Sequence, residues 1–302
     1  MASFDLRCVA PTGDHCGEAL LWSDDEGAIY WTDVNRFLVH RMVLATSAVE
    51  SWLFDEPCVA LSLTSRAGTL LLAVGSRLLL WQPAGDVRDD YGFALASAPG
   101  ARLNEGQSGP GGEFWVGSMG NNVGPDGETR DFAGAPGELF RIIDGAPPQR
   151  FRSGLQIANT LCFSPDRRTL YFGDSLQNIV WRHDYDAATR TISGETPFFA
   201  GFDRGVPDGS AVDCDGFLWN ARFGGGCLVR VAPDGSIDRL VELPISNPTT
   251  CAFGGADLRT LFITSASIHL SRPERLAGSV FALEAPVPGM PAFAFHLACQ
   301  SG

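Results

Sequence analysis

The chain has 302 residues, of which 45% are hydrophobic and 19% charged, and its formal net charge is −13 at pH 7. No nucleic-acid partner is expected, because binding to phosphates requires a basic face. The 35 glycines and 19 prolines indicate many turns and few long helices.

The N-terminal residues 1–7 lack a basic stretch followed by an apolar one, so no secretory signal is predicted. The chain contains no run of 18 apolar residues, so neither a membrane span nor a membrane partner is predicted. The eight cysteines are scattered along the chain without a Cys-x-x-Cys pair. We therefore expect a cytoplasmic protein whose thiols are reduced.

Short apolar strands recur along the chain at nearly even intervals. When one large apolar residue in each strand is taken as a marker, the successive intervals are 41, 43, 57, 47 and 43 residues. An inner strand and a turn precede each marker strand, and an alternating strand follows it. Six units of this length match four-stranded propeller blades. The markers are Trp31, Leu72, Trp115, Phe172, Trp219 and Phe262.

The sequence therefore predicts an all-β protein, a six-bladed β-propeller with four-stranded blades that forms a single domain over residues 1–302. A strand at residues 6–10 precedes the first unit, and residues 292–297 end the last one. We expect both terminal strands to lie in the last blade, because closing the ring removes the exposed sheet edges. The longest insertion, residues 120–136, is predicted to be a loop on one face.

One position, 11 or 13 residues before each marker, is oxygen-bearing in five of the six units. The two-residue difference fits a shorter hairpin and, being even, keeps the side chains on the same face of the strand. The residues at this position are Glu18, Val59, Asn104, Asn159, Asp208 and Thr249.

These side chains are expected to point at a common axis, because the innermost strands of a propeller begin at one mouth of its central channel. Two carboxylates and two carboxamides that meet there repel one another or stay unpaired unless a cation lies between them. Oxygen ligands favour Ca²⁺, Mg²⁺ or Mn²⁺, while Zn²⁺ and Fe²⁺ also accept carboxylates. We predict one divalent metal ion and leave its identity open.

Four pairs of motifs carry a resemblance to a known family. They are residues 17–22 with 30–33, 102–104 with 114–119, 157–159 with 164–166, and 207–209 with 218–219. Taken together, they resemble the senescence marker protein/gluconolactonase (regucalcin-like) family over nearly the whole chain.

The resemblance implies a six-bladed propeller that hydrolyses a sugar lactone. In that family a divalent metal is held by residues that match Glu18, Asn159 and Asp208, and substrate is held by residues that match Arg102 and Asn104. We expect the metal to polarise the lactone carbonyl and Asp208 to act as the general base.

The chain departs from the family pattern around the mouth. Glu105 stands where the family commonly has Asp, and residues 109–112 are a glycine-rich turn where the family usually has an acidic one. An acidic residue after position 119 is replaced by Asn121 or Asn122. These changes leave the preferred lactone open, as well as whether Asn121, Asn122 or His15 contacts substrate.

Two other functions remain open at this point. One is a Ca²⁺-binding regulatory or interaction propeller without catalysis, and the other is a metal-dependent esterase or phosphotriesterase. The dispersed histidines and the absence of a Gly-x-Ser-x-Gly motif disfavour serine-hydrolase chemistry. Thr249 is interpreted as a strand-end hydroxyl, and Asp33 and Asp174 as turn formers. We expect a monomer or a weak homo-oligomer.

Overall fold

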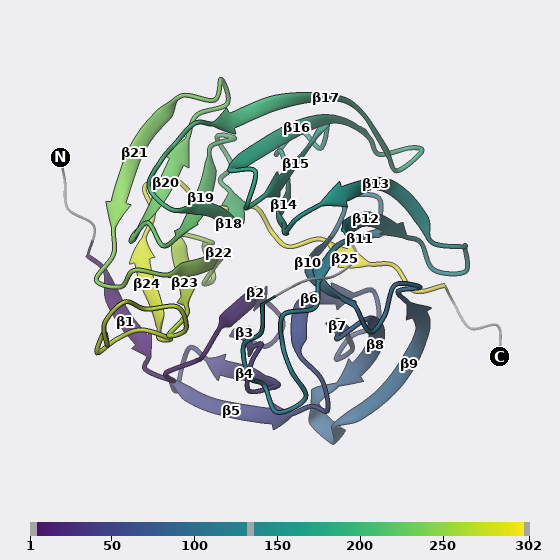
Figure 1. Cartoon of the computed structure of the whole chain (residues 1–302), viewed down its shortest axis with the longest axis horizontal. Coiled ribbons are helices and arrows are strands. Elements are labelled where there is room, and N and C mark those ends of the chain that lie inside the picture. Colours follow the sequence, from purple (N-terminus) through teal and green to yellow (C-terminus); the bar gives the residue numbers. More distant parts are fainter. Residues whose placement is uncertain (1–4, 132–135, 299–302) are drawn as a thin grey trace.

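The computed structural model describes residues 5–131 and 136–298 as six sheets arranged in a ring (Figure 1), in which all strand pairs but one are antiparallel. The strands of each sheet follow one another from the centre of the ring outward, mostly in chain order. The predicted six-bladed propeller with four-stranded blades is therefore confirmed.

The strands fall into four concentric sets, with one strand from each blade in each set. The innermost strands are β2 (Gly17–Ser23), β6 (Cys58–Thr64), β10 (Ala101–Ser108), β14 (Ala158–Phe163), β18 (Val206–Val212) and β22 (Pro248–Gly254). The second strands are β3 (Ala28–Asp33), β7 (Leu70–Val74), β11 (Phe114–Gly120), β15 (Thr169–Asp174), β19 (Leu218–Phe223) and β23 (Thr260–Ser265). The third strands are β4 (Leu38–Val43), β8 (Arg77–Gln82), β12 (Gly137–Ile142), β16 (Ile179–Asp186), β20 (Cys227–Val231) and β24 (Val280–Glu284). The outer strands are β5 (Ala48–Leu53), β9 (Val87–Ala94), β13 (Gln149–Leu155), β17 (Thr191–Ala200), β21 (Ile237–Glu242) and β1 (Arg7–Ala10). A short 3₁₀ turn, η1 (Pro83–Gly85), connects β8 to β9.

The second strands are buried on both faces because each sheet is covered by its two neighbours. Trp31, Trp115 and Trp219 are fully buried in these strands. Their indole N–H groups donate to buried carboxylates at 2.9 to 3.0 Å, so that no polar atom of the rings is left unpaired. The accepting residues are Asp14, Glu113 and Asp213. The marker residues that repeat in the sequence are thus the core between the blades.

Ring closure follows the prediction at the N-terminus and differs from it at the C-terminus. Strand β1 pairs antiparallel with β24 and completes the sixth blade, as expected. The predicted C-terminal strand does not join that blade, and this part of the prediction is wrong. Instead, β25 (Ala294–Phe295) pairs parallel with β6 and adds a fifth strand to the second blade. The physical reason is Phe295, whose ring is fully buried in the core beside that blade.

The C-terminal segment crosses the ring to reach β6, and its path is visible as the yellow trace through the centre of Figure 1. Phe293 packs against Phe163 of the fourth blade, with ring centroids 6.0 Å apart. Residues 290–293 also line a small central cavity of about 100 Å³. The segment therefore covers one end of the central channel, and the other end is the mouth.

The predicted loop at residues 120–136 includes residues 132–135, which lie outside the described residues. The preceding part of the loop reaches across to the first blade, where Asn35 Nδ2 donates to the Gly127 carbonyl at 2.8 Å. Gly127 has a φ of +79°, and a Cβ atom there would lie 1.9 Å from the Asn35 carbonyl oxygen. Only glycine fits at this contact.

The seven cysteines within the described ranges are free thiols, as predicted, and Cys299 lies outside those ranges. Cys214 is exposed, whereas the others are buried or half-buried. Across residues 5–131 and 136–298, no helix has the length and apolar character needed to span a membrane.

The position of the C-terminal segment is tested by Phe295→Ala. Loss of the buried ring should lower the free energy of unfolding by about 3–5 kcal/mol, measured by urea denaturation. Leu53→Ala is the control, because Leu53 is 67% exposed on β5 and should change stability by less than about 0.5 kcal/mol. Equal stability of the two variants would contradict the packing of this segment.

Candidate functional site

One cavity at the mouth of the channel contains all five predicted site residues. Its volume is about 460 Å³, which is in the range of small-molecule sites. The predicted residues that line it are Glu18, Arg102, Asn104, Asn159 and Asp208.

The backbone is irregular at this position in every blade. Each innermost strand shifts register against the second strand here, at Glu18/Leu21, Cys58/Ala60, Leu103/Gly106, Asn159/Leu161, Pro207/Ser210 and Pro248/Cys251. Such bulges change the direction of a side chain and are frequent next to active sites. Ala19 and Thr160 adopt left-handed φ angles of 55° and 51°, a conformation that costs non-glycine residues free energy. They directly follow Glu18 and Asn159.

The two carboxylates in the cavity lie close enough to affect each other. Burial raises the pKa of Glu18, and the charges of Asp208 and Glu105 raise it further. Burial likewise raises the pKa of Asp208, and the charge of Glu105 raises it further. Ionised carboxylates at this mouth are therefore costly unless a cation compensates them, which is the condition under which a metal ion binds.

Arg102 and Asn104 lie beside these carboxylates on β10. Arg102 Nη1 donates to Asn104 Oδ1 at 2.6 Å, and its Nε and Nη2 donate to Asn122 Oδ1 at 3.0 and 2.9 Å. Asn104 Nδ2 then donates to Asn159 Oδ1 at 3.0 Å. Burial lowers the pKa of Arg102 to about 10, so the guanidinium keeps its charge at neutral pH.

The sequence left open whether Asn121, Asn122 or His15 contacts substrate, and the structure places these three residues differently relative to the cavity. Asn122 lines the cavity and holds Arg102, whereas Asn121 does not line it. His15 is exposed and lines a neighbouring hollow of about 550 Å³, together with residues 125–129. Thr249 is fully buried outside the cavity, where its hydroxyl donates to the Gly17 carbonyl. It is a strand-end hydroxyl, as interpreted from the sequence.

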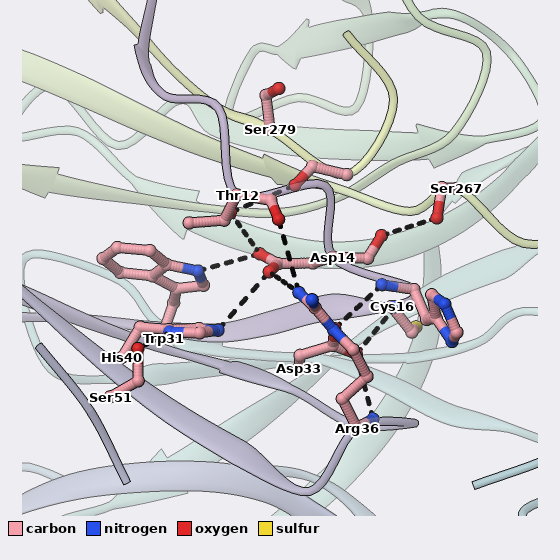
Figure 2. Close-up of polar contacts among 12 residues, drawn as sticks. Thr12, Asp14, Cys16, Trp31, Asp33, Arg36, His40, Ser51, Ser267 and Ser279 are labelled. Carbon is pink, nitrogen blue, oxygen red and sulfur yellow. Dashed lines mark hydrogen bonds and ion pairs between the residues drawn. The ribbon is translucent and has the colours of Figure 1, made fainter. Parts of the chain in front are cut away.

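Asp14 and Asp33 hold the segment that leads into Glu18 (Figure 2). Asp33 accepts the backbone N–H groups of His15 and Cys16 at 2.9 and 3.2 Å. Arg36 joins the two carboxylates by bonding to both of them. Asp33 thus forms a turn, as predicted, and the turn positions the beginning of β2.

Figure 2 also shows an Asp–His–Ser arrangement that the sequence did not suggest. His40 Nδ1 lies 2.7 Å from Ser51 Oγ, and His40 Nε2 lies 3.4 Å from Asp14 Oδ1. Nε2 makes no hydrogen bond there, so Asp14 does not orient the ring as a catalytic triad requires. Asp14 is instead occupied by Trp31 and Arg36, and none of the three residues lines the mouth cavity. The arrangement is structural.

Several residues of the cavity were not predicted as site residues. Ser175 follows β15, Phe223 ends β19, and His269 lies in the loop after β23. All three lie at or after the ends of second strands, whereas the predicted site residues lie near the beginnings of innermost strands. Ser175 and Phe223 come three and four residues after the markers Phe172 and Trp219, and this side of the markers was not compared between the units.

A family model described as SMP-30/gluconolactonase/LRE-like region matches residues 16–267. The chain belongs to this family. A 6-deoxy-6-sulfogluconolactonase of Pseudomonas putida is 33% identical over 292 residues, which is 94% of this chain and 96% of the relative. The pentonolactonase XacC of Haloferax volcanii is 30% identical over 294 residues, with the same 94% and 96% coverage. Among solved structures, a calcium-binding protein, regucalcin, from Agrobacterium tumefaciens is similar, with a TM-score of 0.88 at 29% identity over 98% of this chain and 100% of its own.

The pH dependence of stability is tested at Glu105, which lines the central cavity next to the mouth. Burial raises the pKa of Glu105 from 4.5 to about 7. Because the pKa of the folded state exceeds that of the unfolded chain, ionisation opposes folding, and stability should fall as pH rises through this window. The expected loss is about 3 kcal/mol. Glu105→Gln should remove it, measured by urea unfolding between pH 4.5 and 8 with chelator present.

The control is Glu284→Gln at the exposed end of β24, which reports the general effect of this substitution. If the stability profiles of wild type and Glu105→Gln run parallel over the whole range, the desolvation of the Glu105 carboxylate at the central cavity is contradicted.

Proposed function

We propose that this protein is a lactonase that hydrolyses a sugar lactone to the aldonic acid, with a divalent metal ion held by Glu18, Asn159 and Asp208. The observation that carries the proposal is the convergence of two carboxylates and two carboxamides on one cavity of small-molecule size. Membership of the family and the names of the lactonase relatives support the reaction class.

The residues fit a divalent ion. Glu18 and Asp208 supply the compensating charge, and each has a pKa raised by burial that a bound cation would lower again. Asn159 Oδ1 accepts one hydrogen bond from Asn104 and keeps a second lone pair. An all-oxygen set favours Ca²⁺, Mg²⁺ or Mn²⁺, with Zn²⁺ or Fe²⁺ as alternatives.

The ion, when bound, supplies a Lewis acid for the lactone carbonyl and for the negative charge that develops on it. Arg102 and Asn104 are proposed to orient the sugar through hydroxyl contacts, because they line the same cavity with donor and acceptor groups. Asp208 takes a proton from water as the water oxygen bonds to the carbonyl carbon. The ring C–O bond then breaks, and its oxygen takes up a proton to leave a hydroxyl and a carboxylic acid.

The Ca²⁺-binding alternative draws on the same oxygen ligands and on the name of the regucalcin structure. A protein that only binds Ca²⁺ has no need of a guanidinium and a carboxamide within the same cavity. Lactone hydrolysis explains Arg102 and Asn104 together with the carboxylates, so we favour it.

The proposal is tested by a pH-stat assay over a panel of aldonolactones. Hydrolysis should stop when EDTA is added and return when individual divalent ions are restored. Asp208→Asn should lower kcat by at least about 10²–10⁴-fold, because it removes the general base and also a charged ligand of the proposed ion. The matched control is Asp215→Asn in the exposed turn after β18, which should retain the wild-type rate.

Absence of turnover above the uncatalysed rate on every lactone would contradict the enzyme. If the protein still bound Ca²⁺ in that case, the regulatory alternative would replace the proposal. Turnover of simple esters or phosphotriesters without lactones would favour the other enzymatic alternative.

A further inference from the structure

A continuous row of hydrogen bonds runs through the cavity wall from the third blade to the fifth. Arg102 donates to Asn104, and Asn104 Nδ2 donates to Asn159 Oδ1. Asn159 Nδ2 then donates to Ser175 Oγ at 2.8 Å, and the Ser175 hydroxyl donates to the Pro207 carbonyl at 2.7 Å. The row ends one residue before Asp208.

Arg102, the first residue of the row, fixes the donor-to-acceptor direction of all the hydrogen bonds in it. A guanidinium has only donors, so Asn104 must present Oδ1 to Arg102 and Nδ2 to Asn159. Asn159 must then accept through Oδ1, which leaves its Nδ2 facing Ser175. Ser175 accepts this bond because its own proton is used on the Pro207 carbonyl.

The orientation of the Asn159 amide decides whether its carbonyl oxygen or its NH₂ group faces a cation at the mouth. In the observed orientation the carbonyl oxygen is on the side of Asn104, which lines the cavity. The reversed amide would set two NH₂ groups against each other and present hydrogens to the cation. Ser175 is only 3% exposed and Asn159 only 6%, so little water can take over the role of the Ser175 hydroxyl.

We infer that Ser175 is a positioning residue of the metal site, which holds the Asn159 amide with its oxygen toward the mouth and ties it to the backbone beside Asp208. The inference rests on the proposed function, because it needs the metal site. It adds a residue from β15's connecting loop to a site otherwise built from innermost strands. Removing such a partner of a metal ligand typically weakens metal affinity 10–100-fold.

The test measures the Kd of Ca²⁺ and of Mn²⁺ by isothermal titration calorimetry on the full chain after removal of metal with a chelator. Ser175→Ala is expected to bind 10–100-fold more weakly than wild type. The same substitution is then made in an Asn159→Asp background. A carboxylate presents an oxygen at either end, so there Ser175→Ala should change the Kd by less than about threefold, and the two effects should be non-additive.

A merely structural role for Ser175 predicts a different pattern. The metal-free Tm would fall while the Kd stayed the same, or the Kd would weaken equally in both backgrounds. Either result overturns the inference and leaves the lactonase proposal standing. A wild-type protein that hydrolyses lactones without binding divalent ions overturns both the metal site and the inference, whereas absence of lactone turnover alone counts only against the proposed function.

Ser175→Cys replaces Ser175→Ala if the alanine variant does not fold. Its thiol fills the same place but hydrogen-bonds weakly. Ser175→Cys should therefore weaken metal binding in the protein that retains Asn159, but not in the Asn159→Asp variant. Equal Kd values for Ser175→Cys and wild type would overturn the inference.

Discussion

The site depends on a backbone irregularity that recurs in the innermost strand of each blade. In a regular strand, successive side chains point to opposite faces of the sheet. At the mouth, however, the register shift in each innermost strand changes that alternation, from Glu18/Leu21 in the first blade to Pro248/Cys251 in the sixth. The ring brings the six shifts to one end of the channel. Polar side chains from blades far apart in the sequence therefore line one cavity.

Bringing Glu18 and Asp208 into one cavity makes their ionised forms costly, and a bound cation would remove this cost. Asp208 is buried and Glu18 half-buried in the cavity wall, and the loss of solvent together with the charges of neighbouring acids raises the pKa values of both carboxylates. Arg102 lies in the same cavity, but it donates hydrogen bonds to the neutral oxygens of Leu103, Asn104 and Asn122. A divalent ion between Glu18 and Asp208 would compensate both charges. The proposed metal site and the positioning role of Ser175 both rest on this one requirement.

Much of the fold was predictable because the blades repeat in sequence. The marker residues are the buried residues between neighbouring sheets, and Glu18, Asn104, Asn159 and Asp208 share a cavity, as their spacing predicted. The C-terminal strand was placed in the wrong blade because a two-residue strand has no periodicity, and the burial of Phe295 is decided by tertiary packing. The bulges and the contribution of Ser175 were missed because hydrogen bonds between blades have no local signature in the sequence.

The proposed metal ion lies between residues of three different blades. Anomalous diffraction from crystals grown with Mn²⁺ tests it most directly. A single strong anomalous peak is expected at the mouth, within coordination distance of Glu18, Asn159 and Asp208. Full-occupancy Mn²⁺ bound elsewhere, or no peak at this position in crystals of protein that hydrolyses lactones with Mn²⁺, would contradict it.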